Sequence, residues 1–86
     1  MTFTVVWADS AAGELAEIWI SALDRPLITA AARDIDHSLH TQPNAVGESR
    51  DGNRRILIAG PLAVTYELSF DDRLVKVLDI WRVASR

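Results

Sequence analysis

The chain has 86 residues, of which 49% are hydrophobic and 24% are charged. This length suits one domain over residues 1–86, and the composition is typical of a globular chain and excludes a disordered one. There is no cysteine, which excludes disulfides and thiolate metal sites, and the net charge of -3 argues against general nucleic-acid binding.

Charge is distributed unevenly along the chain. Residues 1–43 carry two basic and six acidic side chains, whereas residues 44–86 carry seven basic and six acidic ones. Any phosphate-binding surface is therefore expected in the second half. The opening segment MTFTVVWADS has neither a basic region nor a long apolar run. A signal peptide and a membrane span are thus not expected, and we expect a cytoplasmic location.

The first half predicts a strand followed by two helices. Residues 2–7 (TFTVVW) are rich in β-branched and aromatic side chains, which predicts a strand. Asp9 and Ser10 are expected to cap the helix that follows, because a short side-chain oxygen accepts from the free N–H groups of a first turn. The apolar stripe of that helix is formed by Leu15, Ile18, Trp19, Ala22 and Leu23.

The second helix is expected between Pro26 and Pro43. Pro26 suits a first helical turn, where its missing N–H group is not needed, and Pro43 ends the helix. The apolar stripe of this helix is thinner and consists of Ile28, Ala31 or Ala32, Ile35 and Leu39. The segment NAVGESRDGN after Pro43 is rich in turn residues and is expected to be a loop.

The second half changes to the two-residue period of strands. RRILIA, LAVTYELS and LVKVLDIW predict three strands, joined by a Gly60–Pro61 turn and by the connection FDDR. In the middle strand, one set of side chains is expected in the core and the alternate set on the opposite face. The core set is Leu62, Val64, Tyr66 and Leu68, and the opposite set is Ala63, Thr65, Glu67 and Ser69. The element order predicts an α+β fold, a two-helix hairpin packed on a small, mostly antiparallel four-stranded sheet.

Four stretches, in this order, resemble one protein family. They are VVWADSAAGELAEIW, AAARDIDHSLHTQP, GESRDGNRRILIAGPLAVTYEL and DDRLVKVLDIWR. Together they resemble the RelE/ParE superfamily, the bacterial toxins of type II toxin–antitoxin modules, also known as plasmid stabilisation proteins. The resemblance covers nearly the whole chain. It implies a RelE/ParE-like fold, growth inhibition, a cognate antitoxin and a higher-order toxin–antitoxin complex, and it implies no cofactor.

The resemblance implies two activities. RelE-like members cut messenger RNA in the ribosomal decoding site, whereas ParE-like members inhibit DNA gyrase. Cutting requires cations around the phosphate and groups that move protons. For a ribonuclease site, the resemblance points to Arg54 or Arg55, at the start of the RRILIA strand, and to Arg82, after the last strand.

Two departures from the ribonuclease pattern favour target binding. Ala63 stands where catalytic relatives commonly carry an arginine. No tyrosine follows Arg82, although RelE-like members often have one near the C-terminus. We therefore expect a toxin that binds a target such as DNA gyrase. A ribosome-dependent endoribonuclease and a non-toxic interaction domain are the two alternatives.

The antitoxin of such a module is expected to bring acidic groups to basic residues of the toxin. The residues expected to bind a partner are Arg50, Arg54, Arg55, Trp81, Arg82 and Arg86. Arg54 and Arg55 are adjacent on a strand and must face opposite sides, so at most one of them shares a surface with another basic residue. A solvated or ion-paired arginine is the simpler interpretation of each.

Histidines and tryptophans are the remaining candidates for chemistry. His37 and His40 are three positions apart on a helix and share one surface, but they lack a complete ligand set, so no metal site is expected. Trp7 and Trp19 are expected in the core because of the area that such rings bury. Trp81, at the end of the last strand, is expected to contact a partner.

Overall fold

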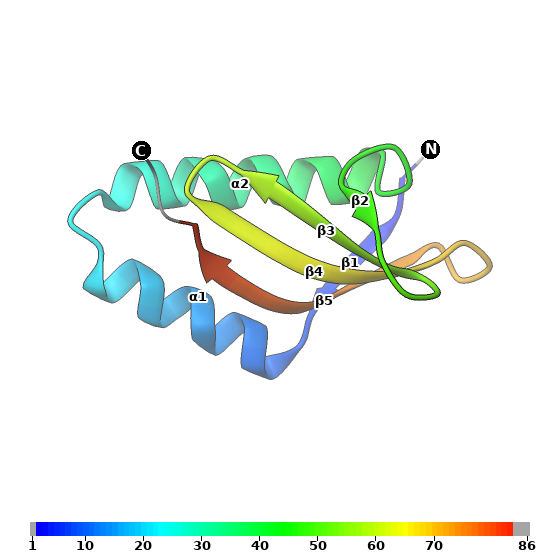
Figure 1. Cartoon of the computed structure of the whole chain (residues 1–86), viewed down its shortest axis with the longest axis horizontal. Coiled ribbons are helices and arrows are strands. Elements are labelled where there is room, and N and C mark those ends of the chain that lie inside the picture. The colour runs from blue at the N-terminus through cyan, green and yellow to red at the C-terminus, as the bar shows by residue number, and fades with distance from the viewer. Residues whose placement is uncertain (1, 84–86) are drawn as a thin grey trace.

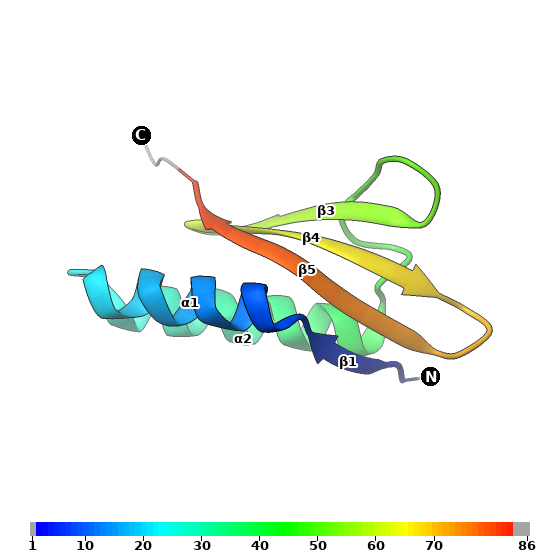
Figure 2. The ribbon, with the colours of Figure 1, turned by 90° about the horizontal axis from the view of Figure 1, so that it is seen from below.

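The computed structural model describes residues 2–83, which form two layers. In chain order the elements are β1 (Thr4–Trp7), α1 (Asp9–Ser21), α2 (Arg25–Thr41), β2 (Glu48–Ser49), β3 (Arg54–Ala59), β4 (Leu62–Ser69) and β5 (Leu74–Arg82). Figures 1 and 2 show both helices on one face of the sheet, the helix face. The other face, which we call the open face, carries no helix from the described residues. No helix in this part of the chain combines the length and apolar character that crossing a membrane requires.

The sheet has five strands in the order β1-β5-β4-β3-β2. Strand β1 pairs parallel with β5, and all other pairs are antiparallel. The expected α+β class and the mostly antiparallel sheet are confirmed, but the sheet has one strand more than the four expected. The extra strand is β2, whose two residues pair with Arg55 and Ile56 inside the segment expected to be a loop. So short a strand leaves no periodic pattern in the sequence.

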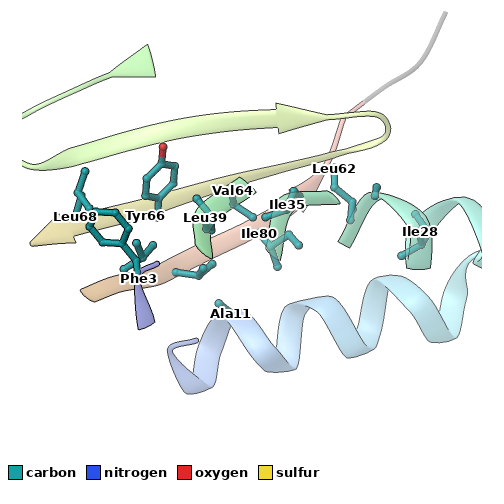
Figure 3. Packing of buried hydrophobic residues seen from close by; sticks show 13 residues of the cluster. Phe3, Ala11, Ile28, Ile35, Leu39, Leu62, Val64, Tyr66, Leu68 and Ile80 are labelled. Carbon is teal, nitrogen blue, oxygen red and sulfur yellow. The ribbon is translucent and has the colours of Figure 1, made fainter. Parts of the chain in front are cut away.

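The core lies between α2 and the central strand β4 (Figure 3). The buried side chains of α2 are Ile28, Ala31, Ile35 and Leu39, each exposed by 5% or less. This is the thinner of the two helical stripes in the sequence, yet it is the fully buried one. The buried side chains that β4 contributes to this core are the expected Leu62, Val64, Tyr66 and Leu68. Each large aliphatic side chain contributes roughly 1.5–3 kcal/mol on burial, so these two elements supply most of the core energy.

The apolar stripe expected on α1 is only partly buried. Leu15, Ile18 and Ala22 pack against the core. In contrast, the side chain of Trp19 is 43% exposed and that of Leu23 is fully exposed. The expectation that Trp19 belongs to the core is therefore wrong.

The end of α1 explains why this stripe is shorter than expected. The guanidinium of Arg25 donates to the last carbonyls of the helix, at 2.9 Å to Trp19 and at 2.8 Å to Ile20. These bonds satisfy backbone groups that a helix end leaves without partners. The helix stops at Ser21, and Leu23 lies in the connection to α2, where helical periodicity no longer applies.

The start of α1 also differs from the expectation. The helix begins at Asp9 and its N-cap is Ala8, which makes no side-chain capping bond. A cap formed by Asp9 and Ser10 is therefore wrong, because both residues already lie inside the helix. The chain enters α1 almost directly from β1, and Trp7, the last residue of β1, is partly buried against the core as expected.

A β-bulge in β5 changes which side chains face the helices. Val77 faces the core, and normal alternation would turn Ile80 to the open face. The pairing of β5 with β4 shifts by one residue between these two positions. Ile80 is consequently buried, at 1% exposure. The shift also turns Trp81 to the open face and Arg82 to the helix face.

Tyr66 attaches the segment after α2 to the sheet. Its hydroxyl lies 2.7 Å from the Pro43 carbonyl and 2.9 Å from the Val46 carbonyl. A hydroxyl carries one hydrogen, and the Val46 carbonyl also accepts from Arg55, so we assign the Tyr66 hydrogen to Pro43. The side chain is fully buried, and burial raises the pKa of the phenol above its ordinary value of 10.0.

We expect Tyr66→Phe to lower the free energy of unfolding by about 1–3 kcal/mol, because the buried Pro43 carbonyl loses its donor while the ring keeps its packing. Urea unfolding of both proteins near neutral pH measures the difference. The wild type should also lose stability as the pH rises above 10.0, because the folded state favours the neutral phenol. An equal alkaline loss in the phenylalanine variant would assign that loss to other groups.

Candidate functional site

The two adjacent arginines of β3 lie on opposite faces of the sheet, as expected from strand alternation. Arg54 is on the open face, where its Nε lies 3.5 Å from Glu67 Oε2 on β4. Arg55 is on the helix face and donates to the carbonyls of Val46 and Gly47, each at 3.2 Å. Arg55 thus stabilises the segment before β2, and Arg54 alone of the two presents charge on the open face.

Arg82 lies on the helix face at the end of β5. Its Nη2 donates to Asp24 Oδ2 at 2.6 Å, in the connection between the two helices. This hydrogen bond lowers the pKa of the Asp24 carboxyl and raises that of the Arg82 guanidinium. The contact joins the end of the sheet to the end of the helical hairpin.

The other residues expected to bind a partner are spread over the molecule. Arg50, beside β2, forms an ion pair with Glu48 at 3.2 Å. Trp81 is 40% exposed on the open face. Arg86 lies outside the described residues. Of the expected positions, Arg54 and Trp81 share the open face, at opposite ends of the paired strands.

The three arginines expected in a ribonuclease site do not converge. Arg54 lies on the open face, whereas Arg55 and Arg82 lie on the helix face and donate to oxygen atoms of this chain. Stabilising a phosphorane-like charge requires several cations near the same reacting atoms. No such group is formed by these three residues.

Another charged row crosses the open face. Glu67 on β4 is flanked in register by Arg54 on β3 and by Lys76 on β5. Two cations beside one carboxylate combine charge stabilisation with a group that can accept a proton. Strand periodicity did not predict a role for Lys76, because cross-strand register cannot be read from that periodicity alone.

Ala63 lies on the open face, as strand alternation predicts, but its exposed fraction is 0%. In register, Ala63 lies between Ile58 on β3 and Trp81 on β5. These two large side chains flank the small methyl group and shield it from water. The three residues form a continuous apolar row at one end of the open face.

A second surface lies between the helices. An open groove of about 1070 Å³ runs between α1 and α2 on the side turned away from the sheet. The α1 wall is mainly apolar and includes Ala12, Ala16, Trp19 and Ile20. The α2 wall carries Ala32 together with the polar side chains Thr29, Arg33, Asp36 and His37. Such a groove, apolar within and charged at the rim, has the character of a helix-binding site.

Two contacts fix the ring of Trp19 in the groove wall. The indole Nε1–H donates to the Thr29 hydroxyl at 3.2 Å. The guanidinium of Arg25 lies 4.6 Å from the ring centroid, within cation–π range. Trp19 is therefore held in place although its side chain is 43% exposed. The sequence signal for this groove was present, since Trp19 and Ile20 make the apolar surface of α1 wider than one buried stripe requires.

His40 connects α2 to the segment before β1. Its Nδ1 lies 2.9 Å from the Phe3 carbonyl, and because a carbonyl only accepts, Nδ1 carries the hydrogen. The other ring nitrogen lies 3.4 Å from Asp36. Within residues 2–83, no three histidine, cysteine or acidic side chains are grouped so that they could hold a metal ion. His40 therefore has a structural partner on each ring nitrogen, and His37 is exposed.

Several solved structures with this fold are toxin–antitoxin proteins. A chain of the toxin–antitoxin complex RelBE2 from Mycobacterium tuberculosis aligns with a TM-score of 0.78 at 17% identity, over 96% of this chain and 100% of that chain. A chain of the chromosomal ParDE system from P. aeruginosa aligns with a TM-score of 0.69 at 20% identity, over 96% and 98%. The isolated RelE toxin of E. coli aligns with a TM-score of 0.68 at 9% identity, over 98% and 87%.

These identities are too low to show more than a shared fold, and the RelE/ParE-like fold expected from the sequence is confirmed. One of the aligned chains, RelE of E. coli, is a toxin in isolated form. No protein-family model matches the sequence, and a search of curated proteins finds no match.

The Asp24–Arg82 contact should stabilise the fold in a pH-dependent way. Because Arg82 lowers the pKa of Asp24 below its ordinary value of 3.8, the stabilisation is fully present above that pH and is lost as the pH falls through the lowered value. Asp24→Asn should therefore be less stable than the wild type near neutral pH and should match it in acid. Urea unfolding at a series of pH values checks this.

The matched control is the partner substitution. Arg82→Gln should cost about as much stability as Asp24→Asn, and the double variant should lose little more than either single one. Fully additive losses would contradict a direct contact between the two side chains.

Proposed function

We propose that this chain is the toxin component of a type II toxin–antitoxin module, inhibited by a cognate antitoxin and acting in the cytoplasm on a protein target such as DNA gyrase. The fold shared with the RelBE2, ParDE and RelE structures supports the toxin assignment. The choice of protein binding over RNA cleavage rests on one observation, the composition of the open face.

The open face is poorly equipped to bind a polyanion. Its cations Arg54 and Lys76 both flank Glu67, and Arg54 is ion-paired with that carboxylate. Arg55 and Arg82, which would complete a basic site, are on the helix face. RNA binding depends on several unpaired cations along the phosphate backbone. The apolar row at the other end of this face is better suited to contact with a protein.

We place the antitoxin in the groove between α1 and α2. An amphipathic helix inserts apolar side chains spaced at three and four residues into such a groove, while its polar side faces water. The alanines Ala12, Ala16 and Ala32 leave room for those side chains, and Trp19 supplies a rigid aromatic contact. Arg33 at the rim suits an acidic residue of the antitoxin. Arg50 and Arg54, both exposed, are proposed as further contacts for acidic groups.

Ribosome-dependent cleavage of messenger RNA is the second candidate. It is favoured by the row of Arg54, Glu67 and Lys76, which combines a proton acceptor with two cations. In this mechanism Glu67 would accept the proton of the attacking 2′-hydroxyl, and the two cations would stabilise the charge that develops on the phosphate. The new bond from the 2′-oxygen to phosphorus would form as the bond to the 5′-oxygen of the next nucleotide breaks, leaving a 2′,3′-cyclic phosphate, and the 5′-oxygen would take a proton from the protonated Glu67 or from water.

Induction of this chain alone tests the proposal. We expect growth to stop, plasmid supercoiling to be lost and messenger RNA to remain intact, and we expect co-expression of the neighbouring gene product to restore growth. Primer extension on abundant messages and gel analysis of plasmid topoisomers provide the two readouts. If messages are cleaved and Glu67→Gln abolishes that cleavage, gyrase inhibition is wrong and the ribonuclease mechanism is correct. Unimpaired growth would contradict both toxin mechanisms and would favour the remaining alternative, a non-toxic interaction domain.

The role of the groove as the antitoxin site is tested by a substitution that places a larger, charged side chain in it. Ala16→Glu places a charged side chain in the apolar wall and should weaken antitoxin binding tenfold or more, a change of about 1.4 kcal/mol. Ala30→Glu, an equally charged change at an exposed position of α2 outside the groove lining, should have little effect. Titration calorimetry with the purified antitoxin measures both. Equal affinities for the two variants would exclude the groove as the antitoxin site.

A further inference from the structure

The apolar row on the open face is an exposed surface with no role in the core. The side chain of Ile58 is 63% exposed and that of Trp81 is 40% exposed, and neither belongs to the core cluster. They flank the buried methyl group of Ala63, so the row is continuous across three strands. Large apolar side chains that are exposed on one face of a sheet are a feature of binding surfaces.

A carboxylate without an ion pair lies next to this row. Asp79 pairs in register with Thr65, whereas Trp81 pairs with Ala63, so Asp79 and Trp81 share the open face one step apart. Glu48 and Glu67 have arginine partners at 3.2 Å and 3.5 Å. Asp79 is exposed and has no ion-pair partner within residues 2–83. An indole ring and a free carboxylate are thus presented side by side.

The geometry of these two groups selects one kind of ligand. Residues two apart on a strand are separated by roughly 6.5–7 Å, which is close to the ~6 Å range of a cation–π contact. A planar guanidinium can stack on an indole ring and donate two hydrogen bonds to a carboxylate at its edge. A lysine ammonium group carries the charge but cannot stack as a plane on the indole ring, so it fits this site less well. A nucleic acid is excluded because its phosphates would be repelled by the Asp79 carboxylate.

We propose that Ile58, Trp81 and Asp79 bind an arginine of the target protein, with an adjacent apolar side chain of that protein lying on Ile58. The inference rests on the proposed function and specifies the chemistry that the target must present. Figure 2 shows the open face on the other side of the sheet from the helices, so this surface is separate from the groove assigned to the antitoxin.

A short peptide tests the surface directly. The probe acetyl-Leu-Arg-Leu-amide is titrated into the full chain, and the indole N–H resonance of each tryptophan is followed by NMR. We expect a saturable shift of the Trp81 resonance, with the Trp7 and Trp19 resonances unchanged. The glutamate analogue acetyl-Leu-Glu-Leu-amide should cause no shift. A shift at Trp19 in place of Trp81, equal shifts with both peptides, or a shift caused by oligouridylate and not by the arginine peptide would overturn the proposal.

Two matched variants distinguish a specific contact by the Asp79 carboxylate from the effect of the net charge of the protein. Asp79→Asn should weaken the arginine peptide about tenfold, as expected for the loss of a charge-assisted contact. Asp71→Asn removes the same charge from the turn at the opposite end of β4 and β5 and should leave the affinity unchanged. Equal affinities of the two variants would contradict the role of Asp79.

Growth assays connect this surface to toxicity. If the wild type stops growth, Asp79→Asn and Trp81→Leu should abolish the arrest while still binding the antitoxin, which shows that both variants are folded. Arrest by Trp81→Leu at wild-type level would overturn the inference. If the wild type itself does not stop growth, the toxin function fails, and the peptide titration alone decides whether the arginine site exists.

Discussion

The bulge in β5 determines which side chains reach each face of the molecule. Without the extra residue, alternation would continue from Val77, and Arg82 would join Lys76 on the open face while Trp81 pointed toward the helices. The bulge lies where β5 extends beyond its pairing with β1, which stops at Val77. Just past it, the Ile80 N–H lies 3.4 Å from a carboxylate oxygen of Glu14 on α1. One inserted residue therefore exchanges a cation for an aromatic ring on the open face.

The distribution of charge follows from the same pairing. Arg25 and Arg55 donate to backbone carbonyls, and Arg54 and Arg82 are paired with carboxylates. A ligand that requires these cations must first displace the acceptors that they already have. An oxygen left without its donor must then be solvated again, which costs energy in proportion to its burial. The two surfaces proposed for binding, the helical groove and the row beside Asp79, are mainly apolar and do not depend on these four cations.

Much of the fold was predictable because long elements carry their period in the sequence. The stripe of α2 and the alternation of β4 place each side chain by local geometry alone, and Tyr66 was assigned correctly on that basis. The exposure of Trp19 was not predicted, because the apolar surface of α1 is wider than the stripe that the core buries and Trp19 lies on the side that lines the groove. Likewise, the face of Arg82 depends on a bulge between strands, and its partner Asp24 is distant in the sequence. Site residues set by local period were predictable, and those set by long-range pairing were not.

The position of β1 has a consequence for how the chain is made. Within residues 2–83 this strand pairs only with β5, in register from Thr4 with Leu74 to Trp7 with Val77, so it has no partner until the segment that forms β5 has been synthesised. Until β5 emerges, β4 also lacks one of its two neighbours, and the helices have an incomplete sheet on which to pack. Contacts of such long sequence separation form late and slowly. The groove and the open face are thus completed only when nearly all of the described chain has been synthesised, and a nascent chain that stalls earlier presents neither surface.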